Sequence, residues 1–175
     1  MNILEILKVI IIGIVEGITE WLPISSTGHI VFIEQLFNFN VSENFKDMFD
    51  VVIQLGAILA VAVVYFKKLN PFNKGRNKKK MYLTIELWKK IIVACLPAVM
   101  LGLLINHWVK EHLLNGFVIS MALIIYGILF IMIENSNKNR AYSIKSVYSI
   151  NYQTALFIGF FQVLALIPGT SRSGA

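Results

Sequence analysis

The stretch GIVEGITEWLPISSTGH, residues 13–29, decides how the rest of the chain is organised. It places two carboxylates, four hydroxyls, a histidine and a proline inside a chain that is otherwise mostly apolar. At 100° per residue, Gly13, Glu16, Gly17 and Glu20 share about one third of a helix circumference. The glycines allow close approach to that face, and the carboxylates are presented to whatever approaches.

The second half of this stretch breaks the helix. Pro23 and Gly28 prevent a helix from running through. We therefore expect Ser25, Ser26 and Thr27 on an irregular turn with free backbone N–H groups.

The composition indicates an integral membrane protein. Of the 175 residues, 57% are hydrophobic and 15% are charged, and the mean hydropathy is +0.69. Soluble domains carry about 25% charged residues. The net charge of +6 would suggest nucleic acid as the partner of a soluble protein. Here lysine-rich cytoplasmic loops explain it, so no nucleic-acid partner is expected.

The apolar segments predict an all-α, polytopic helix bundle that forms one transmembrane domain over residues 1–175. Two segments around the polar break are too short to span and suggest a re-entrant hairpin, which is tolerated only where protein or water surrounds the backbone. The hairpin helices are expected at 2–22 and about 28–37, and the spans at 45–66, 91–109 and 113–133.

The connecting segments set the orientation. Residues 67–90 hold nine of the sixteen lysines and arginines, so this segment is predicted to be a cytoplasmic loop. Residues 135–149 fit a second cytoplasmic loop, and residues 107–112 fit a short outer turn. The first hairpin would then enter the membrane from outside.

An internal repeat is suggested by a shift of 146 residues. Under this shift Ser25 aligns with Ser171 and Gly28 with Gly174, and Glu16 aligns with Gln162. The first repeat would cover 1–134, and the second would begin at 150–175 with a second, truncated hairpin that enters from the cytoplasm. Inverted repeats of this kind place their site where two broken helices meet near the membrane midplane.

The segment PGTSRSG, residues 168–174, carries an arginine inside a predicted membrane segment, and such charges default to function. The guanidinium of Arg172 can hold a phosphate through two parallel hydrogen bonds. Hydroxyls and backbone N–H groups of both turns would add donors to the phosphate. The candidate phosphate-binding residues are Ser25, Thr27, Thr170, Ser171, Arg172 and Ser173.

The opposing half of the site would hold the reactive groups. Glu16 and Glu20 can share a divalent cation, or one of them can be protonated and act as an acid. His29 can act as general base or nucleophile, and Ser26 as a nucleophile that His29 activates. Together with Arg172 these residues form a toolkit for phosphoryl transfer.

The segments at 16–29 and 168–174 resemble the two signatures of the undecaprenyl-diphosphate phosphatase family, also called the bacitracin-resistance protein family. The resemblance implies an enzyme of the bacterial inner membrane whose site faces the extracytoplasmic side. It would convert undecaprenyl diphosphate to undecaprenyl phosphate, recycle the carrier of peptidoglycan synthesis and confer bacitracin resistance. Magnesium or calcium is the implied activator. The residues that match the family's functional positions are Glu16, Glu20, Ser26, His29 and Arg172.

Some expectations depart from this resemblance or compete with it. Family members continue for several helices beyond the second motif, so residues 1–175 are expected to be an incomplete chain. A lipid-phosphate transporter, or flippase, that uses the same pocket is the main alternative, and a scaffold without a site is a third. The expected partners are the polyprenyl diphosphate lipid, the bilayer and, as an option, a second copy of the chain.

Overall fold

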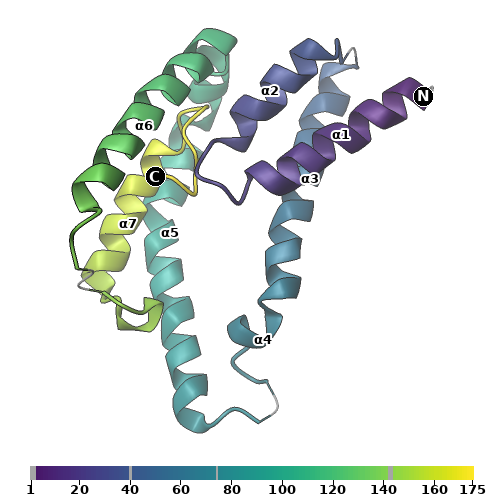
Figure 1. The fold of residues 1–175 in the computed structure, drawn as a ribbon. Helices are drawn as coiled ribbons and strands as arrows, with labels where there is room; N and C mark the ends of the chain where they lie inside the picture. The colour runs from purple at the N-terminus through teal and green to yellow at the C-terminus, as the bar shows by residue number, and fades with distance from the viewer. Residues whose placement is uncertain (1–2, 40, 74, 142–143) are drawn as a thin grey trace.

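The computed structural model describes residues 3–39, 41–73, 75–141 and 144–175, and within them it contains helices and no strand. Figure 1 shows the arrangement of these helices. Their bounds are α1 Ile3–Thr19, α2 Ser26–Leu36, α3 Glu43–Val64, α4 Phe66–Leu69, α5 Lys78–His112, α6 Gly116–Asn137, the 3₁₀ turn η1 Val147–Ser149 and α7 Tyr152–Leu164.

Three of the described helices, α3, α5 and α6, are long and apolar enough to cross a membrane. The prediction of a membrane helix bundle is therefore confirmed at this level. With 17 residues, α1 is about 25 Å long, which is short of the roughly 30 Å hydrocarbon core. The helices α2 and α7 are shorter still, with 11 and 13 residues.

The helices α1 and α2 fold back on each other, and α1 packs against α3 (Figure 1). Their shared core consists of Ile12, Ile30, Phe39 and Phe49, all buried. The rings of Phe39 and Phe49 lie 5.9 Å apart between their centroids. This core fixes where the turn after α1 lies.

The helix α7 lies directly against α5, and glycine permits the close approach. A Cβ at Gly159 would lie 2.3 Å from the carbonyl oxygen of Ala94 and 3.0 Å from Cδ of Pro97. No residue with a Cβ fits at this position without movement of the helices, because such distances are far below van der Waals contact.

The tail after α7 is fixed against α6 in a similar way. Gly169 has a φ of +94°, and a Cβ there would lie 2.7 Å from the carbonyl oxygen of Ile119. The tail, drawn in yellow in Figure 1, then reaches the turn between α1 and α2.

The predicted cytoplasmic loop at 67–90 is partly wrong. Residues 66–69 form α4, and α5 already begins at Lys78, where the side chain of Asn77 accepts a 2.6 Å hydrogen bond from the N–H of Lys79. Lysines are good helix formers, so their charge marks the aqueous side without ending the helix. The predicted outer turn at 107–112 is likewise the last turn of α5.

The bounds of the first two helices also differ from the prediction. The first helix ends at Thr19 rather than near residue 22. The second begins at Ser26 rather than Gly28, because Ser25 caps it by accepting a hydrogen bond from the N–H of Gly28 at 3.4 Å. Ser25 therefore lies in the turn, as expected, whereas Ser26 and Thr27 form the first helical turn of α2.

Candidate active site

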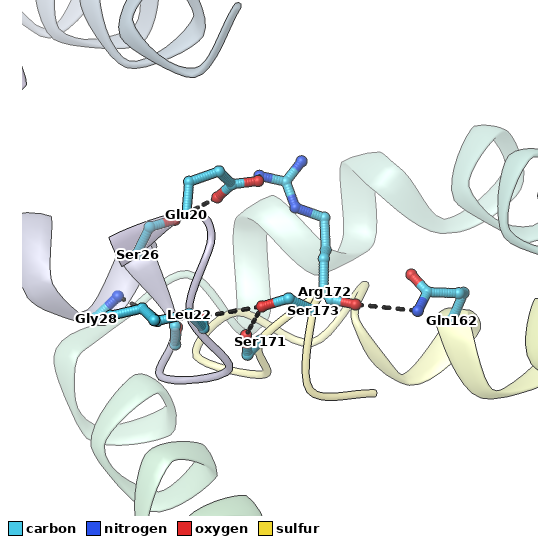
Figure 2. A network of polar contacts seen from close by, with 9 residues as sticks. Glu20, Leu22, Ser26, Gly28, Gln162, Ser171, Arg172 and Ser173 are labelled. Carbon is cyan, nitrogen blue, oxygen red and sulfur yellow. Dashed lines mark hydrogen bonds and ion pairs between the residues drawn. The ribbon is translucent and has the colours of Figure 1, made fainter. Parts of the chain in front are cut away.

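The centre of the candidate site is the carboxylate of Glu20. Its Oε1 accepts a hydrogen bond from Nη2 of Arg172 at 2.9 Å, and its Oε2 accepts one from Oγ of Ser26 at 2.7 Å. Figure 2 shows the three side chains converging from two separate turns. The side chain of Glu20 is 18% exposed and that of Arg172 is 44% exposed, so the pair is only partly covered by the described residues.

The turn that carries Glu20 is built from short backbone hydrogen bonds. The N–H of Glu20 still bonds to the carbonyl oxygen of Glu16 at 3.0 Å, which extends the helical geometry one residue past α1. Pro23 has no N–H to continue it, and the N–H of Ile24 bonds to Leu22 at 2.8 Å. Ser25 has a φ of +63°, which is an uncommon conformation for a residue other than glycine and often marks a functional site.

The turn that carries Arg172 is tied to the first turn through its backbone and hydroxyls. Oγ of Ser173 donates to the carbonyl oxygen of Leu22 at 2.8 Å, and Oγ of Ser171 lies 3.0 Å from that of Ser173. From α7, Nε2 of Gln162 donates to the carbonyl oxygen of Arg172 at 3.0 Å (Figure 2). The backbone at Arg172 is thus held by Gln162 of α7 and, through the neighbouring Ser173, by the turn after α1.

His29 lies one helical turn from Ser25 and does not bond to Ser26 in the described part of the chain. Its Nδ1 is 2.8 Å from the carbonyl oxygen of Ser25. A carbonyl can only accept, so Nδ1 carries the proton, and Nε2 of a neutral ring is left as an acceptor. The ring lines a cavity of about 660 Å³ between α2 and α6.

Four of the five candidate phosphate-binding hydroxyls line one of two cavities, and Ser173 lines neither. Ser25, Thr170 and Ser171 line one of about 350 Å³, where aromatic and aliphatic side chains of α6 form the opposite wall. Thr170 is buried, and its Oγ1 makes no hydrogen bond with the described residues. Thr27 faces a different cavity of about 470 Å³ between α2, α3 and α6. The first three residues are brought together, whereas Thr27 is not.

Glu16 is the most buried charged residue that the structure describes, with 0% exposure. Neither carboxylate oxygen makes a hydrogen bond of good geometry with the described residues. Its polar neighbours are Ser26 and Gln54. Its carboxylate also interacts electrostatically with the charged side chains of Glu20 and Arg172. The carboxylate lines the 470 Å³ cavity.

The sequence interpretation missed the supporting contacts. Gln162 was noted only as the repeat partner of Glu16, yet its amide holds the backbone of Arg172. The carbonyl of Leu22 has no sequence signature as an acceptor. Asp50 and Gln54, to which the sequence interpretation gave no role, line the same cavity as Glu16.

Comparisons with known proteins identify the family of the chain. The family model described as "Bacitracin resistance protein BacA" matches residues 9–175. The chain belongs to the BacA family. The resemblance inferred from the two motifs is therefore confirmed, and both turns of the candidate site lie inside the part of the chain that matches BacA.

Several relatives of this BacA chain are named undecaprenyl-diphosphatase. The protein of Streptococcus thermophilus is 52% identical over 173 residues, which is 99% of this chain and 60% of the relative. That of Limosilactobacillus fermentum is 55% identical over 172 residues, 98% of this chain and 62% of the relative. That of Enterococcus faecalis is 53% identical over 178 residues, 100% of this chain and 64% of the relative. The chain thus spans less than two thirds of the length of these relatives.

Proposed function

We propose that the protein is a membrane-embedded phosphatase that converts undecaprenyl diphosphate to undecaprenyl phosphate and phosphate. It would thereby recycle the lipid carrier of peptidoglycan synthesis and give bacitracin resistance. The observation that carries the proposal is the hydrogen bond from Arg172 to Glu20, which lie 152 residues apart in the sequence, together with the hydrogen bond from Ser26 to the same carboxylate. The names of its BacA relatives support the same substrate.

Substrate binding divides between charge and apolar contact. Arg172 holds the diphosphate through its guanidinium, which is less than half exposed and so less weakened by water than a surface arginine. The 350 Å³ cavity beside Ser25 and Ser171 has the apolar walls that the first prenyl units of a lipid diphosphate require. A water-soluble phosphate ester has no apolar group that could pack against that wall.

The geometry supports Ser26 as the attacking group more than His29. Oγ of Ser26 already donates to Glu20, so the carboxylate can take the proton as Oγ bonds to the terminal phosphorus. The bond from phosphorus to the bridging oxygen breaks, and undecaprenyl phosphate leaves. Water then hydrolyses the phosphoserine and releases phosphate. His29, whose Nδ1 is bound to the backbone, remains the alternative nucleophile or base through Nε2.

A divalent cation, magnesium or calcium, is part of the proposal. Glu16 fits such a group, because a buried carboxylate without hydrogen bonds leaves both oxygens available. Glu20 fits it less well, since each of its oxygens already accepts a hydrogen bond. When bound, the ion would neutralise part of the charge of the diphosphate.

The finer architecture belongs to the same proposal. The short helices α1 and α2 would form a re-entrant hairpin from the outer side, and α7 with its tail would begin an inverted copy. The 146-residue shift supports this, because it places α7 (152–164) at 6–18, within the bounds of α1. The site would face the extracytoplasmic side of the bacterial inner membrane. The repeat limits at 1–134 and 150–175, and a homodimer, remain predictions.

A lipid-phosphate transporter that uses the same pocket is the competing function. The hydrogen bond between Ser26 and Glu20 favours the enzyme, because a transporter needs no activated hydroxyl. Release of phosphate from undecaprenyl diphosphate by the detergent-solubilised protein separates the two functions. Ser26→Ala, Arg172→Ala and Glu20→Gln should abolish release, while Arg140→Gln, an exposed arginine outside the site, should not. Normal release by all three site variants would refute the phosphatase.

A further inference from the structure

A group of exposed lysines, here called the basic surface, follows directly after the apolar helix α3. Its members are Lys67 and Lys68 of α4 and Lys78, Lys79 and Lys80 of the first turn of α5. The sequence has no aspartate or glutamate between Asp50 and Glu86. Within the described ranges, none of the five lysines forms an ion pair. Five positive charges therefore lie together without a counter-charge from these parts of the chain.

Arg76 fixes the backbone of the first two lysines. Its Nη2 donates hydrogen bonds to the carbonyl oxygens of Lys67 and Lys68 at 2.7 and 2.8 Å. Its Nη1 donates to Oγ1 of the buried Thr84 on α5. Carbonyls at the end of a helix lack partners and attract cations, and here the guanidinium already occupies them. The ammonium group of Lys68 lies 5.9 Å from the centroid of the Tyr65 ring, which leaves its charge in place.

Aromatic side chains lie in the same segment as the lysines. Nε1 of Trp88 donates to the carbonyl oxygen of Leu69 at 2.9 Å, so the indole lies at the end of α4. Phe72 is 77% exposed and Tyr82 is 61% exposed. Tryptophan and tyrosine concentrate at the membrane–water interface, where an apolar ring and a polar group are both accommodated. The rings therefore favour a lipid over a soluble acidic protein as the partner of the basic surface.

We propose that the basic surface binds the headgroup of an anionic phospholipid from the adjacent leaflet, with Lys67 and Lys68 at its phosphate. Lysines that directly follow a membrane-spanning helix are attracted to such headgroups. The exposed apolar side chains of Val63 and Val64, at the end of α3, offer a surface to the acyl chains. A free anion would use the lysines alone, whereas a lipid uses the lysines and the apolar surface together.

The three lysines of α5 strengthen the attraction without touching the same headgroup. Lys78 and Lys80 lie about 9 and 6 Å along the helix axis from Thr84, the residue that Arg76 contacts. These distances are close to the Debye length of about 8–10 Å, so their charges are only partly screened. No residue of the basic surface lines the three cavities of the candidate site. The proposal is therefore independent of the phosphatase, and lipid binding is measured without turnover.

Trp88 provides a local probe for the test, and Trp108, near the other end of α5, provides a matched control. Two versions of the full chain each keep one of these tryptophans and carry phenylalanine at the other two tryptophan positions. Each is reconstituted in phosphatidylcholine vesicles that contain brominated phosphatidylglycerol, whose bromine atoms quench indole fluorescence on contact. Brominated phosphatidylcholine gives the quenching by a zwitterionic lipid, and thermal unfolding checks that each version folds. We expect phosphatidylglycerol to be preferred beside Trp88 and not beside Trp108.

Replacement of single lysines tests which charges hold the lipid. Lys67→Gln and Lys68→Gln should each lower the preference beside Trp88 about 5-fold, which is the contribution of one lysine at an anionic surface. The double variant Lys138→Gln/Arg140→Gln removes two exposed charges from the segment after α6 and should leave the preference unchanged. Sodium phosphate at the concentration of the anionic lipid should not displace it.

Four results would overturn the proposal. Equal preference beside both tryptophans would mean that the basic surface does not select the lipid. An unchanged preference in both lysine variants would exclude Lys67 and Lys68 as its contacts. An equal loss in the control variant would show attraction by net charge alone. Displacement by sodium phosphate would show that the surface binds a free anion rather than a lipid.

Discussion

Replacement of Gly159 by alanine tests whether the packing of α7 against α5 positions the candidate site. The new Cβ would lie 2.3 Å from the carbonyl oxygen of Ala94, whereas ordinary contact begins at 3.4 Å. The helices must therefore separate by the difference, 1.1 Å. Backbone atoms cannot move aside as a flexible side chain would. Overpacking of this kind costs about 1–3 kcal/mol of unfolding free energy.

The same displacement reaches the site, because Gln162 on α7 holds the backbone of Arg172. A movement of about 1 Å at a reacting group can lower the rate about 10²-fold. We therefore expect Gly159→Ala to unfold at lower denaturant in an SDS titration, and to release phosphate from the lipid diphosphate about 10²-fold more slowly.

Gly56→Ala is the matched control. A Cβ at Gly56 would meet nothing within 4 Å among the described residues, so alanine there should raise helix stability by about 0.5–1 kcal/mol. The reasoning is refuted if Gly159→Ala matches Gly56→Ala in both unfolding and phosphate release.

Three further predictions concern single contacts. Arg172→Lys keeps the charge but loses the planar fork, so phosphate release should fall about 10²–10³-fold, and a rate near that of the unmodified protein would contradict the phosphate-binding role. Lys46→Met leaves the buried carboxylate of Glu34 without its ion-pair partner and should cost about 1–3 kcal/mol in SDS unfolding; the double variant with Glu34→Gln should recover most of it, and no recovery would show that the pair is unimportant. Ser173→Ala removes the 2.8 Å hydrogen bond to the carbonyl of Leu22 and should cost about 0.5–1.5 kcal/mol, whereas an unchanged unfolding midpoint would mean that water replaces it.

The long apolar runs could be predicted well because length and hydropathy determine them. The expected spans at 45–66 and 113–133 correspond to α3 at 43–64 and α6 at 116–137. The charged segment at 67–90 could not be interpreted in the same way. Its lysines predict that the segment lies outside the hydrocarbon core, but they do not distinguish a helix from a loop. Only the cap at Asn77 marks where α5 begins.

The residues of the candidate site could be predicted from the sequence, but not which carboxylate contacts Arg172 and Ser26. A guanidinium, two carboxylates and a serine in a membrane chain are conspicuous, so Arg172, Glu20 and Ser26 could be named from sequence. The two carboxylates were treated as one pair because they lie four residues apart. In the structure the two carboxylates have different contacts: Glu16 lines the 470 Å³ cavity, whereas Glu20 accepts hydrogen bonds from Arg172 and Ser26. That divergence depends on the backbone turn, which no pattern of residue types specifies.

The separation of Arg172 from Glu20 by 152 positions has a consequence for biosynthesis. At about 5–20 residues per second, the ribosome adds the arginine about 8–30 s after the glutamate. During that interval the turn after α1 carries the carboxylate of Glu20 without its guanidinium partner. The candidate site would thus remain incomplete until Arg172 has been added, and shorter nascent chains would lack the Glu20–Arg172 pair.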